Sequence, residues 1–125
     1  MKIMFDMQVT AANNRSRRFY IEGSASLHDL HRAILTEFKK SDNHLHAFFM
    51  NNCVWDPTAE YVSPFAEMDN VAGFTDKTAL SIFPLRKGSE FLYIFDFGKE
   101  QRFQVKVMEV LDEETNEPIK FRVLG

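Results

Sequence analysis

The stretch "FLYIFDFGKEQRFQVKV", residues 91–107, decides the fold class. Phe91 to Phe95 form a continuous apolar run, which is typical of a strand buried on both faces. After a break, Phe103, Val105 and Val107 alternate with polar residues, as in a strand with one wet face. We therefore predict a β-hairpin whose loop contains Gly98 at positive φ, a conformation that glycine adopts without steric cost.

The same stretch contains Asp96-Phe97-Gly98, a triplet that binds magnesium in protein kinases. A kinase also needs a glycine-rich loop, a lysine–glutamate pair and a His-Arg-Asp catalytic loop. The sequence has none of these patterns. The triplet is therefore interpreted as hairpin geometry, with Asp96 bonding nearby backbone amides.

Outward from this hairpin, the sequence predicts an α+β fold with a mostly antiparallel sheet and one main helix. Residues 2–9 alternate in polarity, turn residues follow, and an apolar run resumes at 19–21, which indicates an N-terminal hairpin. Ser26 and Asp29 form a capping-box pattern at the start of a helix predicted over residues 27–40. The strand-strand-helix-strand start is compatible with a β-grasp.

The later elements are predicted from shorter signals. "HLHAFFM", residues 44–50, has strand composition, with His44, His46 and Phe48 on one face. A short strand near Tyr61, a short second helix within 76–85 and a last strand over 119–124 complete the prediction.

Length and composition predict a single domain over residues 1–125. The chain can bury about two-thirds of its unfolded surface, and its thirteen phenylalanines favour an aromatic core. The net charge of −3 disfavours generic coating of nucleic acid. Asp6 interrupts the apolar N-terminus, and no apolar run reaches membrane-spanning length. We expect a soluble, cytoplasmic protein.

All four histidines lie between residues 28 and 46. His31, His44 and His46 form a candidate site for zinc or another transition metal, with Asp42, Asp96 or Cys53 as a fourth ligand. The alternative is that these rings are structural and bond buried polar groups. The second interpretation is favoured, because no Cys pair and no His-Glu-x-x-His spacing is present.

The other candidate binding residues are basic or aromatic. Arg15, Arg17 and Arg18 lie at the predicted tip of the first hairpin and could contact phosphates, although a solvated charged turn is the favoured interpretation. Trp55, Tyr61 and Phe65 can line a pocket or anchor a long loop. Asp96 completes the set of binding candidates.

Three stretches, "LHDLHRAILTEF", "SDNHLHAFFMNN" and "FLYIFDFGKEQRFQVKVMEV", resemble the Ri-plasmid ORF-three-like family, whose members are often labelled insertion-element passenger proteins of TnpR type. His31, the His44-Leu45-His46 run and Asp96-Phe97-Gly98 fall on its motifs. Where that pattern has an acid, a Trp and a His, this chain has Lys99, Gln101 and Phe103. The resemblance implies an α+β fold and a bacterial mobile-element context, without an established activity.

The sequence thus favours a non-catalytic binding or interaction module with an unknown partner. A metal-dependent enzyme that uses His31, His44 and His46 is the alternative. No bound cofactor is expected under the first interpretation, and nucleic acid is not the favoured partner.

Overall fold

The computed structural model describes residues 2–113 and 121–123. Its strands are β1 (Lys2–Ala11), β2 (Ser16–Glu22), β3 (His46–Phe49), β4 (Glu60–Val62), β5 (Gly73–Phe74), β6 (Glu90–Phe95), β7 (Gln101–Glu113) and β8 (Phe121–Val123). The α-helix α1 spans Leu27–Glu37, and 3-10 helices cover Pro57–Ala59, Thr75–Lys77 and Leu80–Ile82. The α+β prediction is confirmed at this level.

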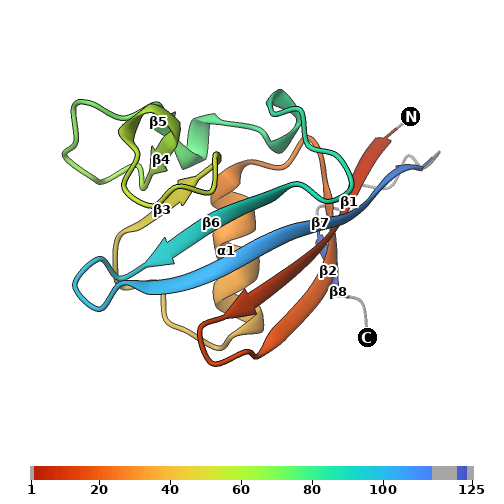
Figure 1. The fold of residues 1–125 in the computed structure, drawn as a ribbon, viewed down its shortest axis with the longest axis horizontal. Coiled ribbons are helices and arrows are strands. Elements are labelled where there is room, and N and C mark those ends of the chain that lie inside the picture. Colours follow the sequence, from red (N-terminus) through yellow and green to blue (C-terminus); the bar gives the residue numbers. More distant parts are fainter. Residues whose placement is uncertain (1, 114–120, 124–125) are drawn as a thin grey trace.

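The strands form one eight-stranded sheet in the order β5-β4-β3-β6-β7-β1-β2-β8. All neighbouring pairs are antiparallel except β4 and β5. Helix α1 lies across one face of this sheet (Figure 1). The predicted strand-strand-helix-strand start is observed, and β6 and β7 separate the N-terminal hairpin from β3.

The N-terminal hairpin and α1 form where the sequence places them. Ser26 accepts a hydrogen bond from the Asp29 amide, and the Asp29 carboxylate accepts one from the Ser26 amide, so the predicted capping box is present. The helix ends at Glu37, earlier than predicted, because Lys39 adopts a φ of 55° and breaks the helical path. Lys39 and Lys40 therefore follow the helix.

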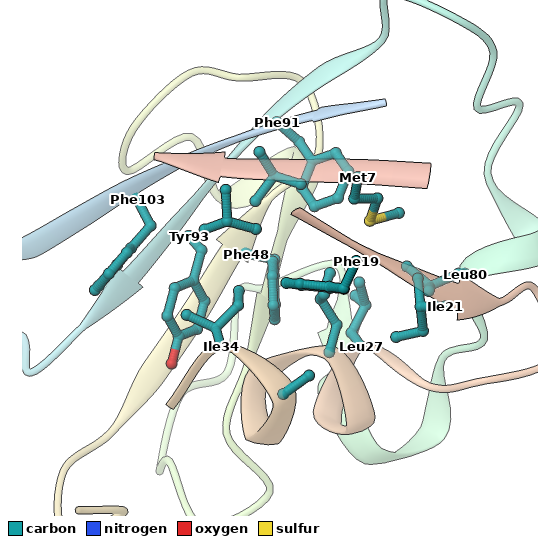
Figure 2. Close-up of a cluster of buried hydrophobic side chains, with 14 of the residues drawn as sticks. Met7, Phe19, Ile21, Leu27, Ile34, Phe48, Leu80, Phe91, Tyr93 and Phe103 are labelled. Carbon is teal, nitrogen blue, oxygen red and sulfur yellow. The ribbon is translucent and has the colours of Figure 1, made fainter. Parts of the chain in front are cut away.

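The main core fills the space between α1 and the sheet. Buried side chains of the helix, including Leu27 and Ile34, meet Phe19, Phe48 and Tyr93 from three different strands (Figure 2). A second buried cluster lies on the opposite face of β3 and β6, around Ala47, Phe49, Val62, Ala66, Leu92 and Ile94. Strand β3 is thus buried on both faces, as its composition predicts.

The prediction of a short second helix within residues 76–85 is wrong, because no α-helix forms there. Two single-turn 3-10 helices replace it. The backbone between them pairs with the segment before α1: the Leu27 amide donates to the Thr78 carbonyl, and the Leu80 amide donates to the Ala25 carbonyl. This pairing needs an extended backbone and overrides the weak i, i+3 signal.

The predicted last strand is described only at Phe121–Val123, where it pairs with β2. Residues 119, 120 and 124 of that prediction lie outside the described residues. Within the described part of the chain, no helix has the length and apolar character needed to span a membrane.

The hairpin at Asp96-Phe97-Gly98 forms, but the expected conformation of Gly98 is wrong. Positive φ angles occur instead at Asp96 (62°) and Glu100 (49°). Aspartate is one of the few residue types that tolerates this region. The Asp96 carbonyl accepts the Glu100 amide, and this bond closes the turn. The triplet is therefore explained by turn geometry, with Asp96 in the role predicted for glycine.

Two glycine substitutions test this correction. Gly98→Ala should change the free energy of unfolding by less than about 0.5 kcal/mol, since its Cβ would meet only Asp96 Oδ1 at an ordinary 3.5 Å. Gly88→Ala should destabilise by about 1 kcal/mol, because Gly88 has a φ of 93° in otherwise open space. Urea unfolding of the two variants measures both values. A larger loss for Gly98→Ala than for Gly88→Ala would contradict this assignment.

Candidate functional site

The candidate site is a layer of three histidines between α1 and β3. His28 and His31 lie one helical turn apart on α1, and His46 is the first residue of β3. The His31 and His46 rings stack at 3.6 Å between centroids, with 10° between their planes. The His28 ring lies 5.2 Å from that of His31 and 5.6 Å from that of His46.

Both nitrogens of His31 have protein partners. Nδ1 lies 2.6 Å from the Tyr93 hydroxyl, and Nε2 lies 3.1 Å from Asp42 Oδ1. A carboxylate only accepts hydrogen bonds, so Nε2–H donates to Asp42 and Nδ1 accepts from the Tyr93 hydroxyl. A single neutral tautomer of His31 satisfies both contacts.

His46 is held in the same way. Its Nδ1 lies 2.9 Å from Ser63 Oγ, and its Nε2 lies 2.8 Å from Thr75 Oγ1. Ser63 Oγ also accepts a hydrogen bond from the His46 backbone amide. All three side chains are buried. The Ser63 hydroxyl is therefore buried and engaged in hydrogen bonds with His46. A catalytic serine would instead expose its hydroxyl to substrate beside a general base.

Burial keeps both stacked rings uncharged. It lowers the pKa of His31 to about 4, an effect that the nearby Asp42 carboxylate partly offsets. Burial, followed by the adjacent His31 and His28, lowers the pKa of His46 to about 2. Burial raises the pKa of Tyr93 well above its usual value. His31 and His46 are thus neutral near pH 7, and two cations stacked at 3.6 Å would repel each other.

A pocket of about 450 Å³ opens beside this layer. It is lined by His28, Asp42, Asn43, His44, Leu45, His46, Ser63, Pro64 and Phe65. Phe65 is 86% exposed, which is unusual for a phenylalanine. His28 Nδ1 is buried and has no hydrogen-bond partner among the described residues. The pocket therefore combines histidine side chains with apolar surface.

The ring nitrogens of the three histidines lie close together, but their orientation does not suit a shared metal ion. One nitrogen from each of His28, His31 and His46 lies within 4.8 Å of the others. The lone pairs of an imidazole lie in the plane of its ring, so two nearly parallel rings cannot both direct a lone pair at one ion. Both nitrogens of His31 and His46 are also hydrogen-bonded. Shared metal binding would require a buried ring to rotate, and the present geometry does not fit it.

His44, which the sequence grouped with His31 and His46, is not in this layer. It lies before β3 begins, is about half exposed, and places Nε2 3.5 Å from Asp96 Oδ2. The strand alternation that grouped it with His46 does not extend to residue 44. His28 was not part of the predicted site, although its i, i+3 spacing from His31 on the helix was a usable signal.

The three arginines of the first hairpin do not form one free basic cluster. Arg18 makes a bidentate ion pair with Asp6, with N···O distances of 2.8 and 2.7 Å. Arg17 donates to the Ser16 carbonyl. Arg15 lines a second pocket, at the end of the sheet. The cross-strand contact of Arg18 depends on register, which the local sequence does not reveal.

The other predicted residues lie apart from the histidine layer. Trp55 packs edge-on against Phe49 and Phe97. Tyr61 packs edge-on against Phe83. Asp96 is buried in its turn, and Cys53 is exposed. Of the three aromatic candidates, only Phe65 lines the histidine pocket.

These observations define an α+β protein with a neutral histidine stack beside an open pocket. The chain belongs to the plasmid pRiA4b ORF-3-like protein family, whose model matches residues 4–123. It is also similar in structure to MM3350 from Methanosarcina mazei Go1, described as a protein of unknown function, with a TM-score of 0.71 and 24% identity. The similarity covers 94% of this chain and 65% of MM3350, and at that identity it shows the fold alone. No curated protein gives a significant match.

Proposed function

We propose that this chain is a non-catalytic binding module. The observation that carries this proposal is the full engagement of His31 and His46, whose four ring nitrogens all contact protein groups. General acid–base catalysis needs a group within reach of a substrate and with a pKa near the working pH. The lowered pKa values of both buried rings support a structural role instead.

The histidine pocket is the proposed binding surface. Its volume of about 450 Å³ lies within the range of about 300–1,000 Å³ found for small-molecule sites. His28 can hydrogen-bond a polar group, while Leu45, Pro64 and Phe65 offer apolar contact. The His31–His46 stack borders this surface through His46, and its ring nitrogens are held by protein groups and take no part in a reaction.

A metal-dependent enzyme is the second candidate, now with His28 in place of His44. The proximity of the three ring nitrogens favours it. Metal binding requires the His31 and His46 rings to separate. Their hydrogen bonds with Ser63, Thr75 and Tyr93 must then be replaced by bonds to the metal. Because leaving a buried polar group unpaired costs about 1–3 kcal/mol, this exchange is unfavourable unless the metal replaces each lost contact.

Metal dependence of the melting temperature separates the two candidates. For protein purified without a His tag, we expect less than stoichiometric metal and the same melting temperature in zinc and in chelator. A ligand set would instead stabilise the fold by about 2.7 kcal/mol at a hundredfold excess of metal over Kd. Such a gain, lost in His28→Ala and retained in His44→Ala, would overturn the non-catalytic proposal.

Several finer expectations form part of the same proposal. They are a single domain over residues 1–125, a cytoplasmic location, a link to insertion-element passenger proteins, and weak or absent binding to nucleic acid at physiological salt. The neutralisation of Arg18 by Asp6 supports the last of these, since it removes one cation from the first hairpin.

A further inference from the structure

A second pocket, of about 340 Å³, lies at the end of the sheet where two turns meet the end of α1. Residues of both the β1–β2 turn and the β6–β7 turn line this pocket, and the two turns lie toward the same side of the sheet in Figure 1. Its apolar lining comes from Ala11, Ala12, Phe38 and Phe103. The Phe38 and Phe103 rings pack edge-on, 5.0 Å apart. The pocket is thus an apolar recess with room for a small organic molecule.

The charged residues around this recess are mostly cationic. Arg15, Lys40 and Arg102 line it together with one carboxylate, Glu100. That carboxylate is already engaged: Arg102 Nη2 donates to it at 2.8 Å and Trp55 Nε1 donates to it at 2.7 Å. These hydrogen bonds lower the pKa of Glu100, so it is ionised near neutral pH. Among the described residues, no carboxylate forms an ion pair with Arg15 or Lys40.

We infer that this second pocket binds a small carboxylate with an apolar body. The apolar lining accommodates the body, and Arg15 and Lys40, which form no ion pair with the residues that the structure describes, select a negative head group. This inference rests on the proposed function as a binding module and names a ligand class for it. The site is separate from the histidine pocket, because the two lining sets share no residue.

Trp55 provides a direct reporter of binding. It is the only tryptophan in the chain, and its indole N–H bonds the carboxylate of Glu100 at the edge of the pocket. A ligand that enters the recess changes the surroundings of Glu100 and therefore the emission of Trp55. Intrinsic fluorescence thus reports on this pocket, and isothermal titration calorimetry gives an independent value of Kd.

The test compares four probes that share one alkyl chain: octanoate, octanamide, octylammonium and octyl phosphate. We expect octanoate to bind, with octanamide and octylammonium at least about tenfold weaker because they lack the negative charge. Added salt should weaken octanoate binding, since the two cations are exposed to screening. Tighter binding of octyl phosphate than of octanoate would overturn the choice of a carboxylate.

Two sets of variants locate the site. Arg15→Gln with Lys40→Gln should weaken octanoate about tenfold and leave the Arg102–Glu100–Trp55 contacts in place. Ala12→Leu should reduce binding by filling the recess without a change of charge. Arg86→Gln, which removes a cation outside the pocket, should have no effect. Equal Kd values for the double variant, Ala12→Leu and Arg86→Gln would overturn the inference.

Failure of this inference is distinguishable from failure of the proposed function. No octanoate binding, together with a melting temperature independent of zinc, would remove only the ligand class and its pocket. Zinc-dependent melting that requires His28 would overturn the non-catalytic role, whatever the result with octanoate.

Discussion

Lowering the pH from 6.5 to 5 should decrease the free energy of unfolding by about 3 kcal/mol, with contributions from His31 and His46. In the unfolded chain both rings bind protons near the ordinary value of 6.5, whereas in the fold their pKa values lie at about 4 and about 2. The unfolded state therefore binds more protons over this interval. This contribution to stability is fully present well above pH 6.5 and is lost progressively as the pH falls through 6.5.

Urea unfolding at several pH values measures this slope. His46→Gln should remove about half of the slope, because it deletes one of the two contributing groups. His44→Gln serves as the matched control and should retain the whole slope, since His44 lies outside the stack. A wild-type protein with equal stability at pH 6.5 and pH 5 would show that the two rings are not held neutral by the fold.

His46→Ala is expected to lower the free energy of unfolding by about 3 kcal/mol at pH 7. The change removes a fully enclosed ring that stacks on His31, and it leaves the hydroxyls of Ser63 and Thr75 without their imidazole partner. Chemical denaturation gives the value directly. The midpoint should shift without a change in the m-value, because the unfolded chain exposes a similar surface.

His44→Ala is the control for this change and should cost less than about 1 kcal/mol. His44 contributes one partly exposed contact of 3.5 Å with Asp96 and an edge-on contact with Phe95. The sequence placed His44 and His46 on one strand face, and both were therefore expected to share one role, either structural or metal-binding. Equal losses for the two variants would contradict the distinction that the structure draws between them.

The parts of the fold that follow local rules were predictable from the sequence. Ser26 and Asp29 cap a helix because capping depends on residues three positions apart. The alternation of polarity in residues 2–9 and 103–107 predicts strands, since a strand turns its side chains to opposite faces. His31 and His46 were likewise identified as candidates from their positions on adjacent elements.

The other features of the fold and the site depend on contacts between segments that are far apart in the sequence. The local pattern of residues does not reveal such contacts. Thr78 and Ala79 are extended because the segment before α1 pairs with them. The hydrogen bond that holds His31 Nδ1 comes from Tyr93, 62 positions further along the chain. Only the assembled fold brings Arg15, Phe38 and Phe103 together around the second pocket.

The protonation state of His31 and His46 tests the structural role of the histidine stack most directly. It can be measured from the ring nitrogens by ¹H–¹⁵N NMR between pH 7 and pH 5, with and without equimolar zinc. The account predicts that both rings stay neutral over this interval, that the proton of His31 remains on Nε2 beside Asp42, and that zinc shifts neither ring. A ring that becomes charged in this interval, or ring nitrogens that shift on addition of zinc, would contradict the assignment of a structural stack in a non-catalytic module.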